Sequence, residues 1–164
     1  MTVFGTLKFL HVLAGFWMTA GLVGRGVAQL RAEHTTEIRS LQLLVELIGR
    51  FDKLMVIPGS MAVFLLGLVT AWAEGLPILG FLKGGRANWL LASIALFVGI
   101  LVAVPTVFLP RGKVFGEAFA DAVATGGVTD RLSSALRDPI VRLAHIYEVV
   151  AILAIIWLMV AKPF

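Results

Sequence analysis

Residues 3–24 read VFGTLKFLHVLAGFWMTAGLVG, and this almost uninterrupted apolar stretch decides the fold class. A helix needs about 20 such residues to cross a bilayer. Three more apolar stretches of similar length occupy residues 54–72, 89–109 and 140–160. Backbone polar groups in lipid must find their hydrogen-bond partners within the protein, so separate spans of this kind form helices. The sequence therefore predicts an all-α integral membrane protein, a four-helix transmembrane bundle that forms a single domain over residues 1–164.

The composition agrees with a chain whose main surroundings are a lipid bilayer. Hydrophobic residues make up 59% of the sequence and charged residues only 15%, and the mean hydropathy is +0.96. A net charge of +4 in a soluble protein would suggest a nucleic-acid partner. Here the basic residues sort by connecting loop instead, so we expect no nucleic-acid partner.

The distribution of basic residues predicts the orientation in the membrane. Ten of the fourteen lie in the first and third connections or at the helix ends beside them: Arg25, Arg31, Arg39, Arg50, Lys53, Arg111, Lys113, Arg131, Arg137 and Arg142. Connections rich in Lys and Arg stay in the cytoplasm. We therefore expect a multi-pass protein of the bacterial inner (cytoplasmic) membrane with both termini extracytoplasmic.

Amphipathic segments are expected in the cytoplasmic connections. Apolar residues recur at helical spacing over residues 38–48, and Thr35 or Thr36 can cap this helix. Residues 114–122 show a similar pattern, and a second short helix follows over residues 130–137. Both connections are therefore predicted to be largely helical.

Two prolines predict irregularities within the spans. Pro58 and Pro105 each lack a backbone donor, so we expect kinks in the second and third transmembrane helices. A compact loop over residues 75–86 joins those two helices.

Several function classes are excluded by what the sequence lacks. The chain contains no Cys, which excludes disulfides, thiolate metal sites, c-type haem attachment and iron–sulfur clusters held by this chain. It also has no Walker loop, dinucleotide-binding fingerprint or paired zinc motif. No catalytic residue is identified, and whether the protein is an enzyme stays open.

One face of the first span carries the most informative polar residues. Six residues recur there at steps of three and four: Lys8, His11, Gly15, Met18, Leu22 and Arg25. An ionisable side chain at membrane depth is costly and usually faces the bundle interior or a water-filled cavity. His11 could ligate haem iron, transfer protons, or make an interhelical hydrogen bond. Gly15, one turn away, leaves room for a neighbouring helix or a flat macrocycle.

A second histidine lies in the last span but at a different depth. The two spans run in opposite directions, so His11 lies in the outer half of the membrane and His145 in the inner half. Their heights differ by roughly 10 to 15 Å in a hydrocarbon core of about 30 Å. The two side chains should therefore not ligate opposite faces of one haem.

A cluster of charged residues is predicted at the inner ends of the helices. Its members are Arg50, Asp52, Arg111, Arg142, His145 and Glu148. They form either a ring of ion pairs that fixes the helices, which we favour, or a substrate or proton site.

Short motifs along nearly the whole chain resemble known families. They are Lys8-x-x-His11, Asp52-x-x-Met55-x-x-Pro58 and the ending Lys162-Pro163-Phe164. They look like an uncharacterised family of bacterial predicted integral membrane proteins. More distantly they are similar to the HemJ-type protoporphyrinogen oxidases and to the CopD-like copper-resistance membrane domain.

The HemJ-type resemblance implies a b-type haem bound by the histidine of the first helix, which is His11 here. That family has an Asn-Glu pair near the start of its last helix, where this chain has His145 and Glu148. This departure weighs against porphyrinogen oxidation more than against haem binding. Five dispersed methionines do not make the Met-rich pathway expected of copper transport.

Two functions are consistent with these residues. In the first, the protein is a small membrane haem or redox protein with His11 as axial ligand and Lys8 and Arg25 as carboxylate partners of the haem. In the second, it is a non-catalytic accessory subunit or assembly factor, which packs in a larger membrane complex or a homo-oligomer, and His11 is structural.

Overall fold

The computed structural model describes residues 3–76 and 88–163. The chain divides into two compact units, Met1–Leu76 and Pro77–Phe164, called here the N-terminal and C-terminal units. The described residues contain helices and no strand, and four of their helical stretches are long and apolar enough to cross a membrane. The expected fold class, an all-α integral membrane four-helix bundle, is confirmed.

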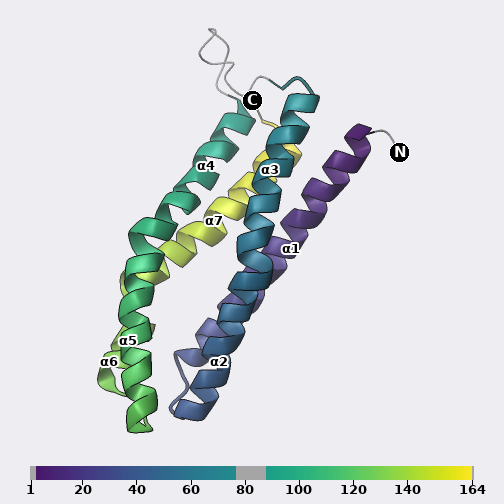
Figure 1. Ribbon diagram of the computed structural model, residues 1–164. Helices are drawn as coiled ribbons and strands as arrows, with labels where there is room; N and C mark the ends of the chain where they lie inside the picture. Colours follow the sequence, from purple (N-terminus) through teal and green to yellow (C-terminus); the bar gives the residue numbers. More distant parts are fainter. Residues whose placement is uncertain (1–2, 77–87, 164) are drawn as a thin grey trace. The chain divides into compact units, whose positions relative to one another are not determined.

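The N-terminal unit is a long helical hairpin (Figure 1). Helix α1 covers Val3–Ala32, and the returning arm consists of α2 (Ile38–Phe51), the π-helical turn η1 (Asp52–Val56) and α3 (Ile57–Ala73). The residues at both junctions of this arm keep right-handed helical dihedral angles. The arm is therefore one continuous helix, and α1 packs along all three of its parts.

The predicted threonine cap of α2 is wrong. The residue at the N-cap is Glu37, whose side chain makes no capping hydrogen bond. The Thr35 hydroxyl donates instead to the carbonyl oxygen of Arg31, at 2.7 Å. This bond serves the last turn of α1, where carbonyl groups lack intrahelical donors, so Thr35 belongs to the end of α1.

Close contact between the two arms of this hairpin depends on four glycines. A Cβ atom added at any of them would come within 2.9 Å of a side chain on the opposite arm. The pairs are Gly21 with Met55, Gly24 with Phe51, Gly59 with Met18, and Gly67 with His11. Each arm contributes two glycines, so the side chains of one arm lie directly on the backbone of the other.

The irregularity expected at Pro58 is a π-helical turn that ends two residues before it. Pro58 has no N–H, so the carbonyl of Leu54, four residues earlier, has no α-helical donor at that position. The Trp17 indole Nε1–H donates to this carbonyl oxygen at 3.1 Å. A side chain of α1 thus replaces the donor that proline removes.

The C-terminal unit also contains a long helical segment (Figure 1), and a π-helical turn lies within it. Its elements in order are α4 (Trp89–Ala103), η3 (Val104–Phe108), α5 (Leu109–Thr125), α6 (Asp130–Leu136) and α7 (Pro139–Ala161). Helix α4 packs against α7, and α5 packs against α6. The proline expected to cause a kink, Pro105, lies inside η3.

Short-range signals end the helices of the C-terminal unit. Asn88 caps α4 by accepting a hydrogen bond from the Leu91 N–H at 2.8 Å, and Thr129 caps α6 through Leu132. Gly126 ends α5 in the left-handed region, with φ of 75°. The short helix expected over residues 130–137 is confirmed, although α6 ends at Leu136, one residue early.

Tyr147 of α7 lies directly against the backbone of α4. Its ring lies over Gly99, where an added Cβ atom would clash with the phenol oxygen, and its hydroxyl donates to the Leu96 carbonyl at 3.1 Å.

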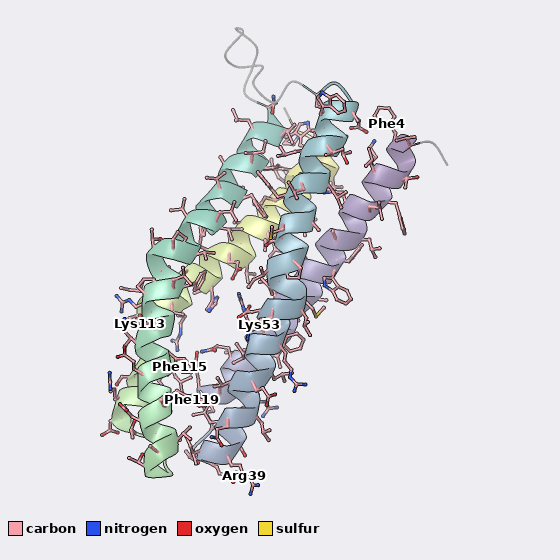
Figure 2. The ribbon with its side chains drawn as sticks, in the orientation of Figure 1. Phe4, Arg39, Lys53, Lys113, Phe115 and Phe119 are labelled. Carbon is pink, nitrogen blue, oxygen red and sulfur yellow. The ribbon has the colours of Figure 1, made fainter. Side chains whose placement is uncertain are left out.

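Figure 2 also shows Phe115 and Phe119 a turn apart on α5, with ring centroids 5.8 Å apart.

The four predicted spans coincide with helices. Residues 3–24 lie in α1, 54–72 in η1 and α3, 89–109 in α4, η3 and the first residue of α5, and 140–160 in α7. Most of the expected loop over residues 75–86 lies outside the described residues. That the chain forms one domain stays a prediction.

Candidate functional site

His11 lies in the contact between α1 and α3. Its ring lies against Gly67, and an added Cβ atom there would be 2.9 Å from Cε1 and 3.4 Å from Nδ1. The backbone of Val63, one turn earlier on α3, lies close enough to the ring to interact with it. The ring is therefore held between two consecutive turns of α3.

One nitrogen of this ring has no partner. Among the described residues, His11 Nδ1 is the buried side-chain polar atom without a hydrogen bond. Leaving a buried polar atom unpaired costs about 1 to 3 kcal/mol. Such an atom at membrane depth is a candidate ligand-binding atom, because a bound group would satisfy it.

The surroundings of His11 differ on the two sides along α1. Toward the N-terminus, Lys8 forms an ion pair with Glu74 at the end of α3. Toward the C-terminus, a Cβ atom added at Gly15 would meet nothing within 4 Å. The position one turn below His11 therefore has open space, and the position one turn above is bridged to α3.

Glu74 is a site residue that the sequence analysis did not single out. Its side chain is 20% exposed, whereas that of Lys8 is 55% exposed. The available signal was its seven-residue step from Gly67, which places both residues on one face of α3. That signal identifies a partner for Lys8 only once α1 and α3 are known to pack together.

Arg25 serves a different part of the hairpin. Its guanidinium Nη1 lies 3.0 Å from Asp52 Oδ1, and the two side chains are 13% and 34% exposed. Arg25 follows His11 by 14 residues, a rise of about 21 Å along α1. This ion pair therefore joins α1 to the π-helical turn, far from the His11 ring.

The remaining residues of the predicted inner cluster belong to both units. Arg50 forms an exposed ion pair with Glu46 on α2 at 2.7 Å, and Arg111 pairs with Asp138 at 2.6 Å. Arg142 is exposed near the start of α7. That all six residues form one cluster stays a prediction.

His145 and Glu148 form a pair within α7. Nδ1 of His145 lies 3.4 Å from Oε2 of Glu148, and Glu148 is buried, with 5% of its surface exposed. The Phe108 ring of η3 packs against the His145 ring, and the two ring centroids are 4.8 Å apart. This pair thus connects α7 to the π-helical turn of the same unit.

The other possible ligands offer less. His34 is exposed, with Nδ1 2.8 Å from the Leu30 carbonyl. In the described part of the chain, no group of three or more His, Cys, Asp or Glu side chains is arranged to hold a metal ion. The candidate site is therefore His11 with its neighbours.

The fold and the site define the class of the protein. It is an integral membrane protein whose described residues form four helices long enough to span the bilayer, and an imidazole with one unpaired nitrogen lies between the first two of them. Residues 5–163 match the family model described as predicted integral membrane protein (DUF2269), and the chain belongs to this family. No curated protein matches the chain, and no solved structure does. The more distant resemblance to HemJ-type and CopD-like proteins stays a prediction.

Proposed function

We propose that the protein binds a b-type haem through His11 and carries out one-electron chemistry in the membrane. The observation that supports this proposal is the buried Nδ1 atom of His11, which has no partner among the described residues. Imidazole is a common axial ligand of haem iron. A membrane-buried imidazole with one free nitrogen suits that role better than the role of an interhelical hydrogen-bonding group.

The residues around His11 fit a ligand role. A histidine that ligates a metal usually gives its other ring nitrogen to a carbonyl or carboxylate, which fixes the ring orientation. The Val63 backbone is suited to this function, and Gly67 lets the ring lie on α3. Open space at Gly15 favours a flat ligand on that side.

Only one of the two expected carboxylate partners fits a haem at His11. Lys8 precedes His11 by three residues, a rise of about 4.5 Å, whereas Arg25 is about 21 Å away along the helix. The two propionates of a haem leave from the same edge, so one haem cannot use both cations. His11 would hold the iron and Lys8 would bind a propionate, while Arg25 stays with Asp52. The bound haem would supply the redox couple.

An absorption spectrum of protein purified from haem-replete cells tests the proposal. We expect a Soret band that is lost or shifted in His11→Ala and kept in His34→Ala, because His34 is exposed and bonded locally. Folded but colourless wild-type protein would contradict the haem proposal and favour a non-catalytic subunit with a structural His11.

We also infer that the protein lies in the bacterial inner membrane with both termini extracytoplasmic. Basic residues near the hairpin tip of the N-terminal unit support this orientation. Figure 2 shows Arg39 near the tip, at the start of α2, with Lys53 about midway along the hairpin and Phe4 at the other end. The cytoplasmic side of a membrane protein carries the excess of Lys and Arg.

A further inference from the structure

We propose that Glu74 determines which ligands the His11 site accepts, because it competes with a ligand carboxylate for the Lys8 ammonium group. This inference rests on the proposed function in that it assigns a ligand to the His11 site. It adds that the protein contains its own competitor for the acidic part of that ligand.

The packing of α1 and α3 places the competing groups beside the site. His11 lies on Gly67, and Lys8, three residues earlier on α1, pairs with Glu74, seven residues later on α3. Because the helices run antiparallel, both contacts lie along the same contact line. The Lys8–Glu74 pair therefore crosses from α1 to α3 about one turn beyond His11 toward the N-terminal end of α1.

The two partners of this pair differ in their freedom to move. Glu74 is mostly covered, whereas more than half of the Lys8 side chain is exposed. Lysine carries a compact charge on a flexible four-carbon stem, and ion pairs with an exposed partner are weak. Lys8 can therefore turn from Glu74 to another carboxylate without rearrangement of the helices.

Charge balance then sets the specificity. With Glu74 in place, the Lys8 ammonium group is already neutralised, and an arriving carboxylate meets the charge of Glu74 as well as that of Lys8. A ligand whose carboxylates are masked avoids this competition. Glu74 therefore lowers the affinity of the site for amphiphilic carboxylates relative to their neutral esters.

The first test compares haemin with haemin dimethyl ester, using the full chain in nanodiscs of zwitterionic lipid. We expect Glu74→Gln to raise the affinity for haemin several-fold and leave that for the ester unchanged. Lys8→Met should lower the affinity for haemin and leave the affinity for the ester unchanged. In the Lys8→Met background, Glu74→Gln should not change the affinity for haemin. Glu46→Gln is the matched control, because it removes the acid of the exposed Arg50–Glu46 pair on the same arm.

A second probe separates this inference from the haem proposal. Acylation of Lys8 by an N-hydroxysuccinimide ester is followed by mass spectrometry, with Lys53 and Lys113 as internal references. We expect dodecanoate, but not methyl dodecanoate, to slow the acylation of Lys8 more strongly in Glu74→Gln than in the wild type. If haemin does not bind, this result still supports competition by Glu74 while the haem proposal fails.

The inference is overturned by one pattern of results. In it, dodecanoate slows the acylation of Lys8 equally in the wild type and in Glu74→Gln. If haemin binds, the ratio of the affinity for haemin to the affinity for its dimethyl ester is also the same in these two proteins. Glu74 would then be a structural partner of Lys8 and would have no influence on ligand choice.

Discussion

Position 67 must be glycine as long as a histidine ring lies against it. The distance of 2.9 Å between an added Cβ atom and His11 Cε1 is shorter than real Cβ contacts allow, and the imidazole is rigid. The free Nδ1 atom and the contact with Val63 both depend on this ring position. The chemistry of His11 is thus controlled by a residue with no side chain.

Gly67→Ala should displace the His11 ring and reduce haem occupancy while the helices persist. Alanine favours a helix by about 1 kcal/mol over glycine, so the substitution opposes local unfolding even as it crowds the ring. Gly26→Ala is the matched control on α1, because an added Cβ atom there meets nothing within 4 Å. The Soret absorbance per mole of folded protein measures the effect, and equal absorbance in the two variants would contradict the role assigned to Gly67.

Asp52→Asn should destabilise the protein and leave any His11-dependent spectrum in place. The change removes the negative charge that faces Arg25, whose side chain is only 13% exposed. The free energy of unfolding should fall by an amount between the two usual limits. These are about 1 kcal/mol for an ion pair that water can reach and about 3 to 5 kcal/mol for a buried ion pair.

Thermal unfolding and haem occupancy are measured on the same Asp52→Asn sample. Glu46→Gln, in an exposed pair of side chains, should change the melting temperature much less. An unchanged melting temperature together with abolished activity would assign Asp52 to a proton or anion pathway instead.

At the scale of helices, the π-helical turns show how each interrupted helix accommodates proline. Turn η1 ends two residues before Pro58, and η3 contains Pro105. In the first, a tryptophan from the opposite helix supplies the missing donor. In the second, the Thr106 hydroxyl donates to the Val102 carbonyl at 2.7 Å, whereas the carbonyl that Pro105 leaves without an α-helical donor is that of Leu101. Side chains thus take part in the hydrogen bonding of both irregular segments.

Trp17→Phe should destabilise the wild type more than it destabilises a Pro58→Ala variant. In the wild type the substitution removes the hydrogen bond from the indole to the Leu54 carbonyl, at a cost of about 0.5 to 1.5 kcal/mol. The Pro58→Ala substitution restores a backbone N–H that can donate to the same carbonyl, so the effect should shrink in that background. A double-mutant cycle of unfolding free energies in mixed micelles measures the coupling.

Trp72→Phe is the control for the Trp17 measurement. Trp72 is 80% exposed on α3, so its replacement should cost little in either background. Additive effects of Trp17→Phe and Pro58→Ala would show that the indole bond does not compensate for the proline.

The sequence predicted the elements better than their partners. Hydropathy located every span because a bilayer demands long apolar runs. It missed the π-helical turns, since one extra residue in a turn hardly alters the apolar period. The sequence also did not predict two ion pairs, Lys8 with Glu74 and Arg25 with Asp52, because each pair joins residues far apart in the chain. The unpaired Nδ1 of His11 could be found only from packing, since spacing indicates a face of a helix but not which atoms find a partner.

At the scale of the whole molecule, cysteine labelling measures the orientation in the membrane directly, because the sequence contains no Cys. In intact cells, a membrane-impermeant maleimide should leave Glu33→Cys and Thr125→Cys unlabelled. Lys83→Cys, which lies outside the described residues, should be labelled. The positive-inside distribution of Lys and Arg is the physical reason, and labelling of Thr125→Cys from outside would invert the topology.

The length of the N-terminal hairpin has a consequence for how the protein settles in lipid. Helix α1 has 30 residues, and the returning arm has 36, so at 1.5 Å per residue they measure about 45 and 54 Å against a hydrocarbon core of about 30 Å. Both arms must emerge from the bilayer, and the Arg25–Asp52 pair marks the depth at which charge begins. In a thicker bilayer this boundary would have to sink into hydrocarbon, whereas in a thinner one the hairpin can tilt. The hairpin should therefore respond unequally to the two directions of hydrophobic mismatch, tolerating thin membranes and resisting thick ones.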